Sequence, residues 1–180
     1  MTQRRIYQSE YPYFVTTKTK DGIWLFDSDQ YARRLSREIF KSGRIKGFDI
    51  LSYQVMPDYL HLLIQYKYQW ERTLEKVRSG WGSYRLFLPT ERMLSSVRSG
   101  IYNEYNISNL IQLIKGNFSR KIHQGNIWQK RFYTRIITNR KYLEIIIHYI
   151  KYNPIKAKLP SKYQKMPYQY FDWIYINCFN

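Results

Sequence analysis

Apolar and polar residues alternate, in part, in three segments of the first part of the chain, and this pattern predicts β-strands. The segments span residues 11–19, 48–56 and 61–66. The third belongs to a run, residues 60–64, that is apolar except for His61, which is typical of a strand buried on most of its surface. Pro57 and Asp58 separate the second and third segments, so these two strands are expected to form a hairpin.

Apolar residues recur at helical spacing in three longer segments, and these are expected to be amphipathic helices. They cover about residues 29–42, 107–123 and 141–152, and a polar residue at the start of each can cap it. Gly43 is the predicted stop of the first helix, and Pro154 disfavours continuation of the third through Asn153. A fourth strand is expected at 132–138. The order strand, helix, two strands, helix, strand, helix predicts an α+β fold.

His61 needs an explanation, because it lies inside an apolar strand. A buried imidazole requires a hydrogen bond, a metal ion or a phosphate. Tyr59 stands two positions earlier, so a pleated strand places both side chains on one face. The spacing suits a pair of metal ligands, although only one of the two residues is a histidine. A hydrogen-bonded core histidine is the simpler alternative.

The charge balance narrows the class of partner. The 180 residues include 30 Lys and Arg against 13 Asp and Glu, a formal net charge of +17. Such an excess points to a polyanion, with nucleic acid first and an anionic membrane surface second. Aromatic residues make up 18% of the chain, and bases of single strands stack on such rings. Many of the tyrosines are equally expected as strand and core residues.

Cysteine content and hydropathy exclude several classes of protein. Cys178 is the only cysteine, so neither a disulfide framework nor a cysteine-based metal site is possible. Residues 2–13 are polar and show no signal peptide, and no apolar run approaches the ~18 residues of a membrane span. We therefore expect a soluble intracellular protein without a membrane partner.

Three blocks of sequence resemble the HUH single-tyrosine transposases, and in particular the REP-associated tyrosine transposases (IS200-like). Residues 56–63, Met-Pro-Asp-Tyr-Leu-His-Leu-Leu, are similar to the family's Met-Pro, polar residue, His-x-His-Leu-Leu. Residues 126–133, Asn-Ile-Trp-Gln-Lys-Arg-Phe-Tyr, resemble its Trp-Gln-Arg-Arg-Phe block. Residues 148–157, His-Tyr-Ile-Lys-Tyr-Asn-Pro-Ile-Lys-Ala, resemble its Tyr-Ile-x-x-Asn-Pro-Val-Lys-Ala block. The blocks follow the family's order, which is more specific than any one of them.

The resemblance implies a ferredoxin-like, four-stranded antiparallel sheet with flanking helices and a catalytic tyrosine on a C-terminal helix. It implies a strand transferase that acts on single-stranded or hairpin DNA through a 5′-phosphotyrosine, with Mg²⁺ or Mn²⁺ as cofactor. On this basis Tyr149 is the nucleophile, and His61 and Asn153 are metal ligands. The resemblance further implies a prokaryotic cytoplasmic protein associated with the nucleoid, either a monomer or a homodimer.

Basic residues are expected to hold the nucleic acid. The candidates in the second half of the chain are Lys115, Arg120, Lys121, Lys130, Arg131, Arg135, Lys151 and Lys156. The chain is expected to be one domain, residues 1–180, within which residues 69–105 form a basic insertion. This insertion is either a solvated loop or an added DNA-contacting flap.

Tyr59 departs from the family pattern, because it replaces the first histidine of the motif. A neutral phenol is a poor ligand for Mg²⁺ or Mn²⁺, so metal binding is expected to be weak. Asp58 is a hard oxygen ligand, but strand alternation directs it to the opposite face. Two hypotheses therefore stay open: a strand transferase, and a domesticated, catalytically degenerate protein that binds single-stranded nucleic acid. An RNA-binding protein with a ferredoxin-like sheet is a third, disfavoured by the lack of an RRM-type motif.

Overall fold

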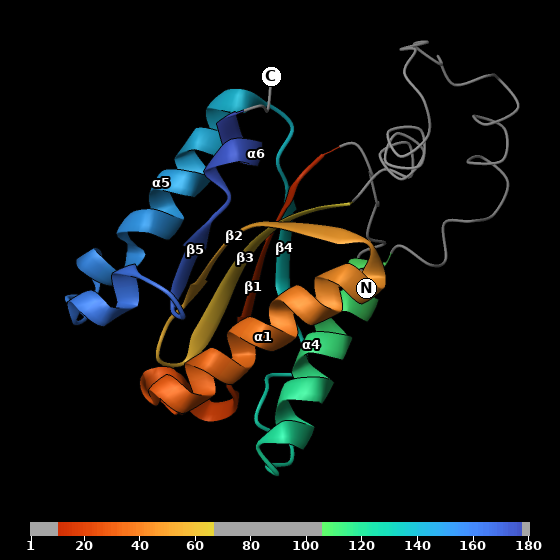
Figure 1. Cartoon of the computed structure of the whole chain (residues 1–180), viewed down its shortest axis with the longest axis vertical. Coiled ribbons are helices and arrows are strands. Elements are labelled where there is room, and N and C mark those ends of the chain that lie inside the picture. Colours follow the sequence, from red (N-terminus) through yellow and green to blue (C-terminus); the bar gives the residue numbers. More distant parts are fainter. Residues whose placement is uncertain (1–10, 67–105, 178–180) are drawn as a thin grey trace, which may run out of the picture.

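The computed structural model describes residues 11–66 and 106–177, which build an antiparallel sheet of five strands. In sheet order the strands are β4 (Tyr133–Ile136), β1 (Tyr13–Lys18), β3 (Tyr59–Tyr66), β2 (Phe48–Val55) and β5 (Gln169–Phe171). The first four strands and their helices alternate as in a ferredoxin-like fold, so the predicted α+β class is confirmed (Figure 1). The predicted number of strands was one too few, because β5 adds to the free edge of β2.

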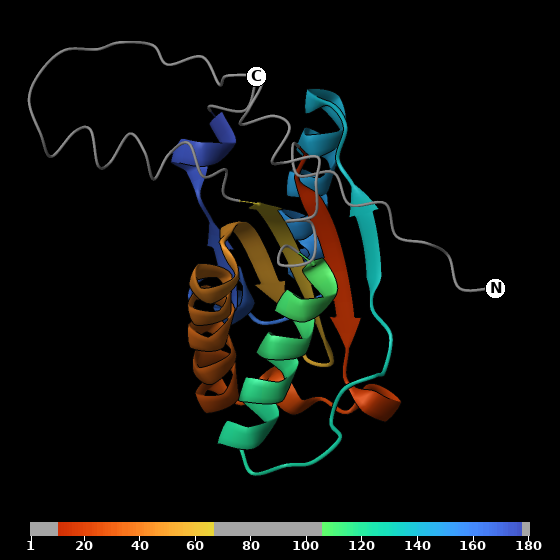
Figure 2. The same cartoon turned by 90° about the vertical axis from the view of Figure 1, so that its right-hand side faces the viewer.

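Helices cover both faces of the sheet. On one face α1 (Asp29–Lys46) packs beside α4 (Ile107–Lys121), and α5 (Arg140–Lys156) covers the other (Figure 2). The remaining elements are α6 (Trp173–Asn177) and the 3-10 turns η1 (Lys20–Gly22), η2 (Leu25–Asp27) and η4 (Ser161–Gln164). None of the helices in the described part of the chain has the length and hydropathy to cross a bilayer. The predicted insertion at 69–105 falls outside the described residues.

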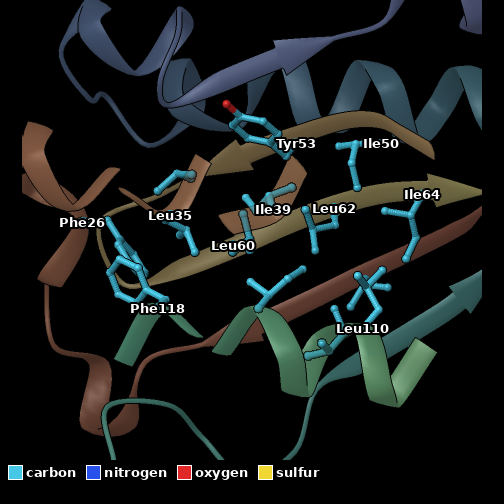
Figure 3. Close-up of a cluster of buried hydrophobic side chains, with 14 of the residues drawn as sticks. Phe26, Leu35, Ile39, Ile50, Tyr53, Leu60, Leu62, Ile64, Leu110 and Phe118 are labelled. Atoms are coloured by element: carbon cyan, nitrogen blue, oxygen red, sulfur yellow. The ribbon is translucent and has the colours of Figure 1, made fainter. Parts of the chain in front are cut away.

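Strand alternation divides the apolar side chains into two cores. The larger core joins the sheet to α1 and α4, and Figure 3 shows part of it, including Phe26, Leu35, Ile39, Leu60, Leu62, Leu110 and Phe118. The smaller core lies under α5 and includes Phe14, Leu63, Leu143, Ile146 and Ile150. His61 has the same alternation as Leu63, so its side chain lies on the α5 side of the sheet.

The first helix runs one turn past its predicted stop at Gly43. A Cβ at Gly43 would lie 3.0 Å from both the Ile50 side chain and the Phe48 carbonyl oxygen, so glycine allows α1 to approach β2 closely. The helix ends instead at Gly47, whose φ of +69° is the left-handed conformation that favours glycine. Sequence reasoning chose the wrong one of two nearby glycines, because close packing against β2 is not a local property.

The last helix also continues beyond its predicted end. α5 includes Pro154, and the Ala157 N–H donates to the carbonyl oxygen of Asn153 in its final turn. Proline removes only one backbone donor, and Pro154 is buried, so the loss near the helix end is tolerated. As a result Asn153 remains helical, one turn after Tyr149, and the two side chains extend toward the same side.

Candidate functional site

A row of polar side chains crosses the sheet on the face that α5 covers. Thr16 is opposite Tyr133 on one side and His61 on the other, and His61 is also opposite Gln54, which pairs with Gln169. Residues directly opposite each other in an antiparallel sheet share a face. His61, only 3% exposed, is therefore the central member of five polar residues, one from each strand.

Both ring nitrogens of His61 have partners within the protein. Nδ1 lies 2.8 Å from Thr16 Oγ1, and Nε2 lies 3.2 Å from Asn153 Nδ2. Because an amide nitrogen only donates, Nε2 is the acceptor, and the neutral ring carries its proton on Nδ1 and donates it to Thr16. Burial first, and Lys18 second, lower the pKa of His61 to about 3, so the ring is neutral at pH 7.

The Tyr59 hydroxyl completes a chain of hydrogen bonds. It donates to Asn153 Oδ1 at 2.8 Å, and its ring centroid lies 4.9 Å from that of His61. Burial is the largest cause that raises the pKa of Tyr59 to about 12, with Tyr149 and Asp58 adding to it, so the phenol is protonated at neutral pH. We call the four side chains Tyr59, Asn153, His61 and Thr16 the polar chain.

Tyr149 lies against the polar chain from α5. Its ring centroid is 5.2 Å from that of His61 and 5.9 Å from that of Phe14, and the residue is 45% exposed. Asn153, by contrast, is 9% exposed. The site thus presents an accessible phenol next to a buried imidazole and a buried amide. The structure brings together the residues predicted for it, while their catalytic and ligand roles stay predictions.

The donor set fits a divalent cation poorly. Asn153 Oδ1, which would be the hard oxygen ligand, already accepts the Tyr59 proton, and Nε2 of His61 faces the amide nitrogen. A protonated phenol offers no anionic oxygen to Mg²⁺ or Mn²⁺. Within residues 11–66 and 106–177, no group of three His, Cys, Asp or Glu side chains is placed to hold a metal ion. The atoms that the metal hypothesis requires are therefore already engaged with one another.

The predicted nucleic-acid contacts on α4 lie on the face of the sheet away from Tyr149. Lys121 forms an ion pair with Glu38, which is 1% exposed, so its charge neutralises a buried acid. Arg120 hydrogen-bonds within its own helix. Lys115 donates to a carbonyl oxygen of the following loop at 2.8 Å. All three cations thus have partners within the protein, and the Lys121 ammonium pairs with a carboxylate that is buried in the core.

Two of the other predicted contacts, Arg135 and Lys151, lie on the side of the sheet that α5 covers. Arg135 of β4 donates to the Tyr142 hydroxyl at 2.8 Å. The Lys151 ammonium lies 5.7 Å and 6.0 Å from the ring centroids of Tyr152 and Trp173. The remaining basic candidates are exposed at the surface: Lys130, Arg131 and Lys156. Arg135 and Lys151 thus each lie close to aromatic rings on this side of the sheet.

Sequence reasoning missed three members of the polar row: Thr16, Gln54 and Gln169. Gln54 is fully buried and accepts a hydrogen bond from Gln169 Nε2 at 2.6 Å. The only local signal was the period of two in their strands, which indicates a shared face but not the strand opposite. Their position beside His61 follows from pairing between segments that are distant in the sequence.

Comparisons with known proteins agree with this architecture. No protein-family model and no curated protein matches the chain. Among solved structures, the chain is similar to a REP-associated tyrosine transposase bound to a REP hairpin, with 22% identity, a TM-score of 0.64, and 94% of this chain and 81% of that chain covered. A presumed transposase from Deinococcus radiodurans R1 follows with 18% identity, a TM-score of 0.42, and 88% of this chain and 98% of that chain covered. The fold predicted from the three sequence blocks is thereby confirmed.

Proposed function

We propose that the chain binds hairpin or single-stranded DNA with a transposase-type fold, and that it does so without metal-dependent strand cleavage. The observation that carries this proposal is the hydrogen bond from the Tyr59 hydroxyl to Asn153 Oδ1. This bond engages the amide oxygen that a metal-dependent site would use as a ligand. Tyr59 itself supplies a proton donor at the position where the family pattern has an imidazole. The chain retains the tyrosine of the family pattern but not its complete donor set.

Charge and surface chemistry support DNA as the partner. The net charge of +17 favours a polyanion. On the α5 side of the sheet, four aromatic residues are between 41% and 51% exposed: Tyr133, Tyr149, Tyr152 and Trp173. Rings interleaved with lysine and arginine suit unpaired bases and their phosphates. The transposase with a similar fold is bound to a REP hairpin, which favours hairpin DNA over other polyanions.

The ionisation state of Tyr59 argues against a metal-bound phenolate. Its pKa of about 12 lies five units above neutral pH. An ordinary tyrosine already keeps its proton at pH 7, and burial makes ionisation of Tyr59 less favourable still. A bound cation would have to overcome this and displace the hydrogen bond to Asn153.

A strand transferase that uses Tyr149 is the second candidate function. It is favoured by the exposure of Tyr149 and by its 5.2 Å centroid distance from His61. In that reaction the Tyr149 oxygen forms a bond to phosphorus while the bond from phosphorus to the 3′ oxygen breaks. The tyrosine proton ends on the leaving 3′ oxygen, and the chain is left as a 5′-phosphotyrosine.

A hairpin DNA with single-stranded flanks separates the two functions. Fluorescence anisotropy in EDTA measures binding by wild type and by Tyr149→Phe. A denaturing gel after incubation with Mn²⁺ measures any covalent adduct, and the same hairpin made of RNA tests the class of nucleic acid. We expect binding in EDTA by both proteins and no adduct. An adduct with wild type that is absent with Tyr149→Phe would establish the strand transferase instead, and absence of binding would refute both functions.

A further inference from the structure

We propose that a groove between α4 and the loop at residues 125–130 binds a phosphate group. Resting on the DNA-binding function proposed above, this phosphate belongs to the nucleic-acid backbone. The groove has a volume of about 240 Å³, and its lining includes Lys115, Gly116, Ser119, Gly125, Trp128 and Lys130. It lies beside α4, the helix on the opposite face of the sheet from Tyr149, so it is separate from the polar chain.

The loop that forms one wall of the groove is fixed to the sheet. The Gln129 N–H donates to the Lys18 carbonyl oxygen at 2.9 Å, and the Lys20 N–H donates to the Ile127 carbonyl oxygen at 2.8 Å. Trp128, only 5% exposed, anchors the loop in the larger core. The wall therefore exists before any ligand arrives, which reduces the entropy lost on binding.

Lys115 supplies a positive charge in a confined position. Its ammonium donates to the Gln129 carbonyl oxygen at 2.8 Å and lies 5.9 Å and 6.0 Å from the ring centroids of Trp128 and Phe132. These contacts hold the ammonium in place, and no carboxylate among residues 11–66 and 106–177 forms an ion pair with it. Burial lowers the pKa of Lys115 to about 8, which indicates that the cation is only partly solvated. A phosphate oxygen would restore the lost solvation through a charge-assisted hydrogen bond.

Two further features of the lining favour an anion. Lys130 adds a second cation, and the described residues that line the groove include no Asp or Glu. Donors and positive charge without a carboxylate are the chemistry that recognises phosphate.

A substitution at Gly116 can change the shape of the groove without removing any contact within the protein. A Cβ built at Gly116 meets nothing within 4 Å, so Gly116→Ala narrows the groove and displaces no neighbour. Alanine is also the better helix former, so the variant should melt no lower than wild type. Lys115→Gln removes the charge directly. Gln112→Ala and Lys41→Gln are the matched controls, because both residues are exposed and neither lines the groove.

The test measures the affinity for hairpin DNA as a function of salt. We expect Gly116→Ala and Lys115→Gln to bind roughly tenfold more weakly than wild type, the scale of one charge-assisted contact. The log–log salt slope should become shallower by about 0.7 for a single-stranded contact or about 0.9 for a duplex contact. Both controls should keep the wild-type affinity apart from a small uniform charge effect in Lys41→Gln. Equal affinity of Lys115→Gln and wild type would overturn the proposal.

Inorganic pyrophosphate separates this proposal from the DNA-binding function. At constant ionic strength, pyrophosphate should raise the melting temperature of wild type and leave that of Gly116→Ala unchanged. If wild type fails to bind DNA but shows this difference, the groove is an anion site and the proposed function is wrong. If wild type neither binds DNA nor responds to pyrophosphate, the groove proposal fails as well.

Discussion

Replacement of Tyr59 by histidine tests whether the phenol keeps a metal ion out of the site. The change removes the hydrogen-bond donor of Asn153 Oδ1 and adds an imidazole on the face of β3 that carries His61. Two imidazoles and one amide oxygen then surround one position, and an open set of three protein ligands is typical of catalytic metal sites. We expect Tyr59→His to bind Mn²⁺ more tightly than Mg²⁺, because imidazole suits the softer ion.

The magnitude follows from the linkage between binding and folding. A ligand that binds only the folded state stabilises it by RT ln(1 + [L]/Kd), which is about 2.7 kcal/mol at 100 times Kd. For a chain of this length, 1 kcal/mol corresponds to about 2–4 °C, so saturating Mn²⁺ should raise the melting temperature by about 5–11 °C. Without metal the variant should be less stable than wild type by about 1–3 kcal/mol, since the buried Asn153 Oδ1 loses its donor.

Thermal melts with Mn²⁺ and with EDTA give the direct measurement. Tyr59→Phe is the matched control, because it removes the same hydroxyl without adding a ligand and should show no response to Mn²⁺. Tyr31→His, on the opposite face of the sheet, controls for an added imidazole elsewhere. Adduct formation on hairpin DNA should accompany metal binding in Tyr59→His, and it should vanish when Tyr149→Phe is added, because phenylalanine has no oxygen to attack phosphorus.

Two results would refute this account of the site. A wild-type protein stabilised by Mn²⁺ as strongly as Tyr59→His would mean that the phenol is no obstacle to the metal. A folded Tyr59→His that ignores Mn²⁺ would mean that Asn153 or His61 cannot turn toward a shared ion. In the second case, the binding-only function would gain support.

Three further predictions concern stability and pH. In urea melts, Tyr59→Phe should lower the free energy of unfolding by about 1–3 kcal/mol, because a buried amide oxygen loses its donor. The control Tyr152→Phe, at an exposed tyrosine, should change the free energy of unfolding by less than about 0.5 kcal/mol. The folded-state pKa of His61, about 3, lies below its unfolded value of about 6.5, so only the unfolded chain takes up this proton as the pH falls between these values. Wild type should therefore lose about 2 kcal/mol more than His61→Gln between pH 6.5 and pH 5, and equal losses would place a solvated histidine there. Since the pKa of Lys115 is about 8, hairpin affinity should fall between pH 7 and pH 9 in wild type and stay constant in Lys115→Gln. Among the described residues that line the groove, Lys130 is the other titratable side chain, and Lys130→Gln should retain the pH dependence.

The sequence by itself determined the features that depend on local periodicity. The period of two placed Tyr59 and His61 on one face of a strand, and the period of 3.6 placed Tyr149 and Asn153 on one side of a helix. The order of these patterns predicted the α+β fold, and the three sequence blocks predicted which residues would meet. These inferences were possible because backbone geometry repeats over a few residues and needs no knowledge of distant partners.

Only the tertiary structure decided what those residues contact. Thr16 and His61 are 45 residues apart in the sequence, and His61 and Asn153 are 92 residues apart, so their hydrogen bonds depend on strand register and on how α5 packs across the sheet. The same non-local packing keeps α5 helical past Pro154 and places Lys121 against the buried Glu38. From the sequence alone, the tyrosine at position 59 indicates only that a metal ligand is missing. In the fold its hydroxyl oxygen lies 2.8 Å from the buried Asn153 Oδ1, so the phenol acts as a hydrogen-bond donor within the site.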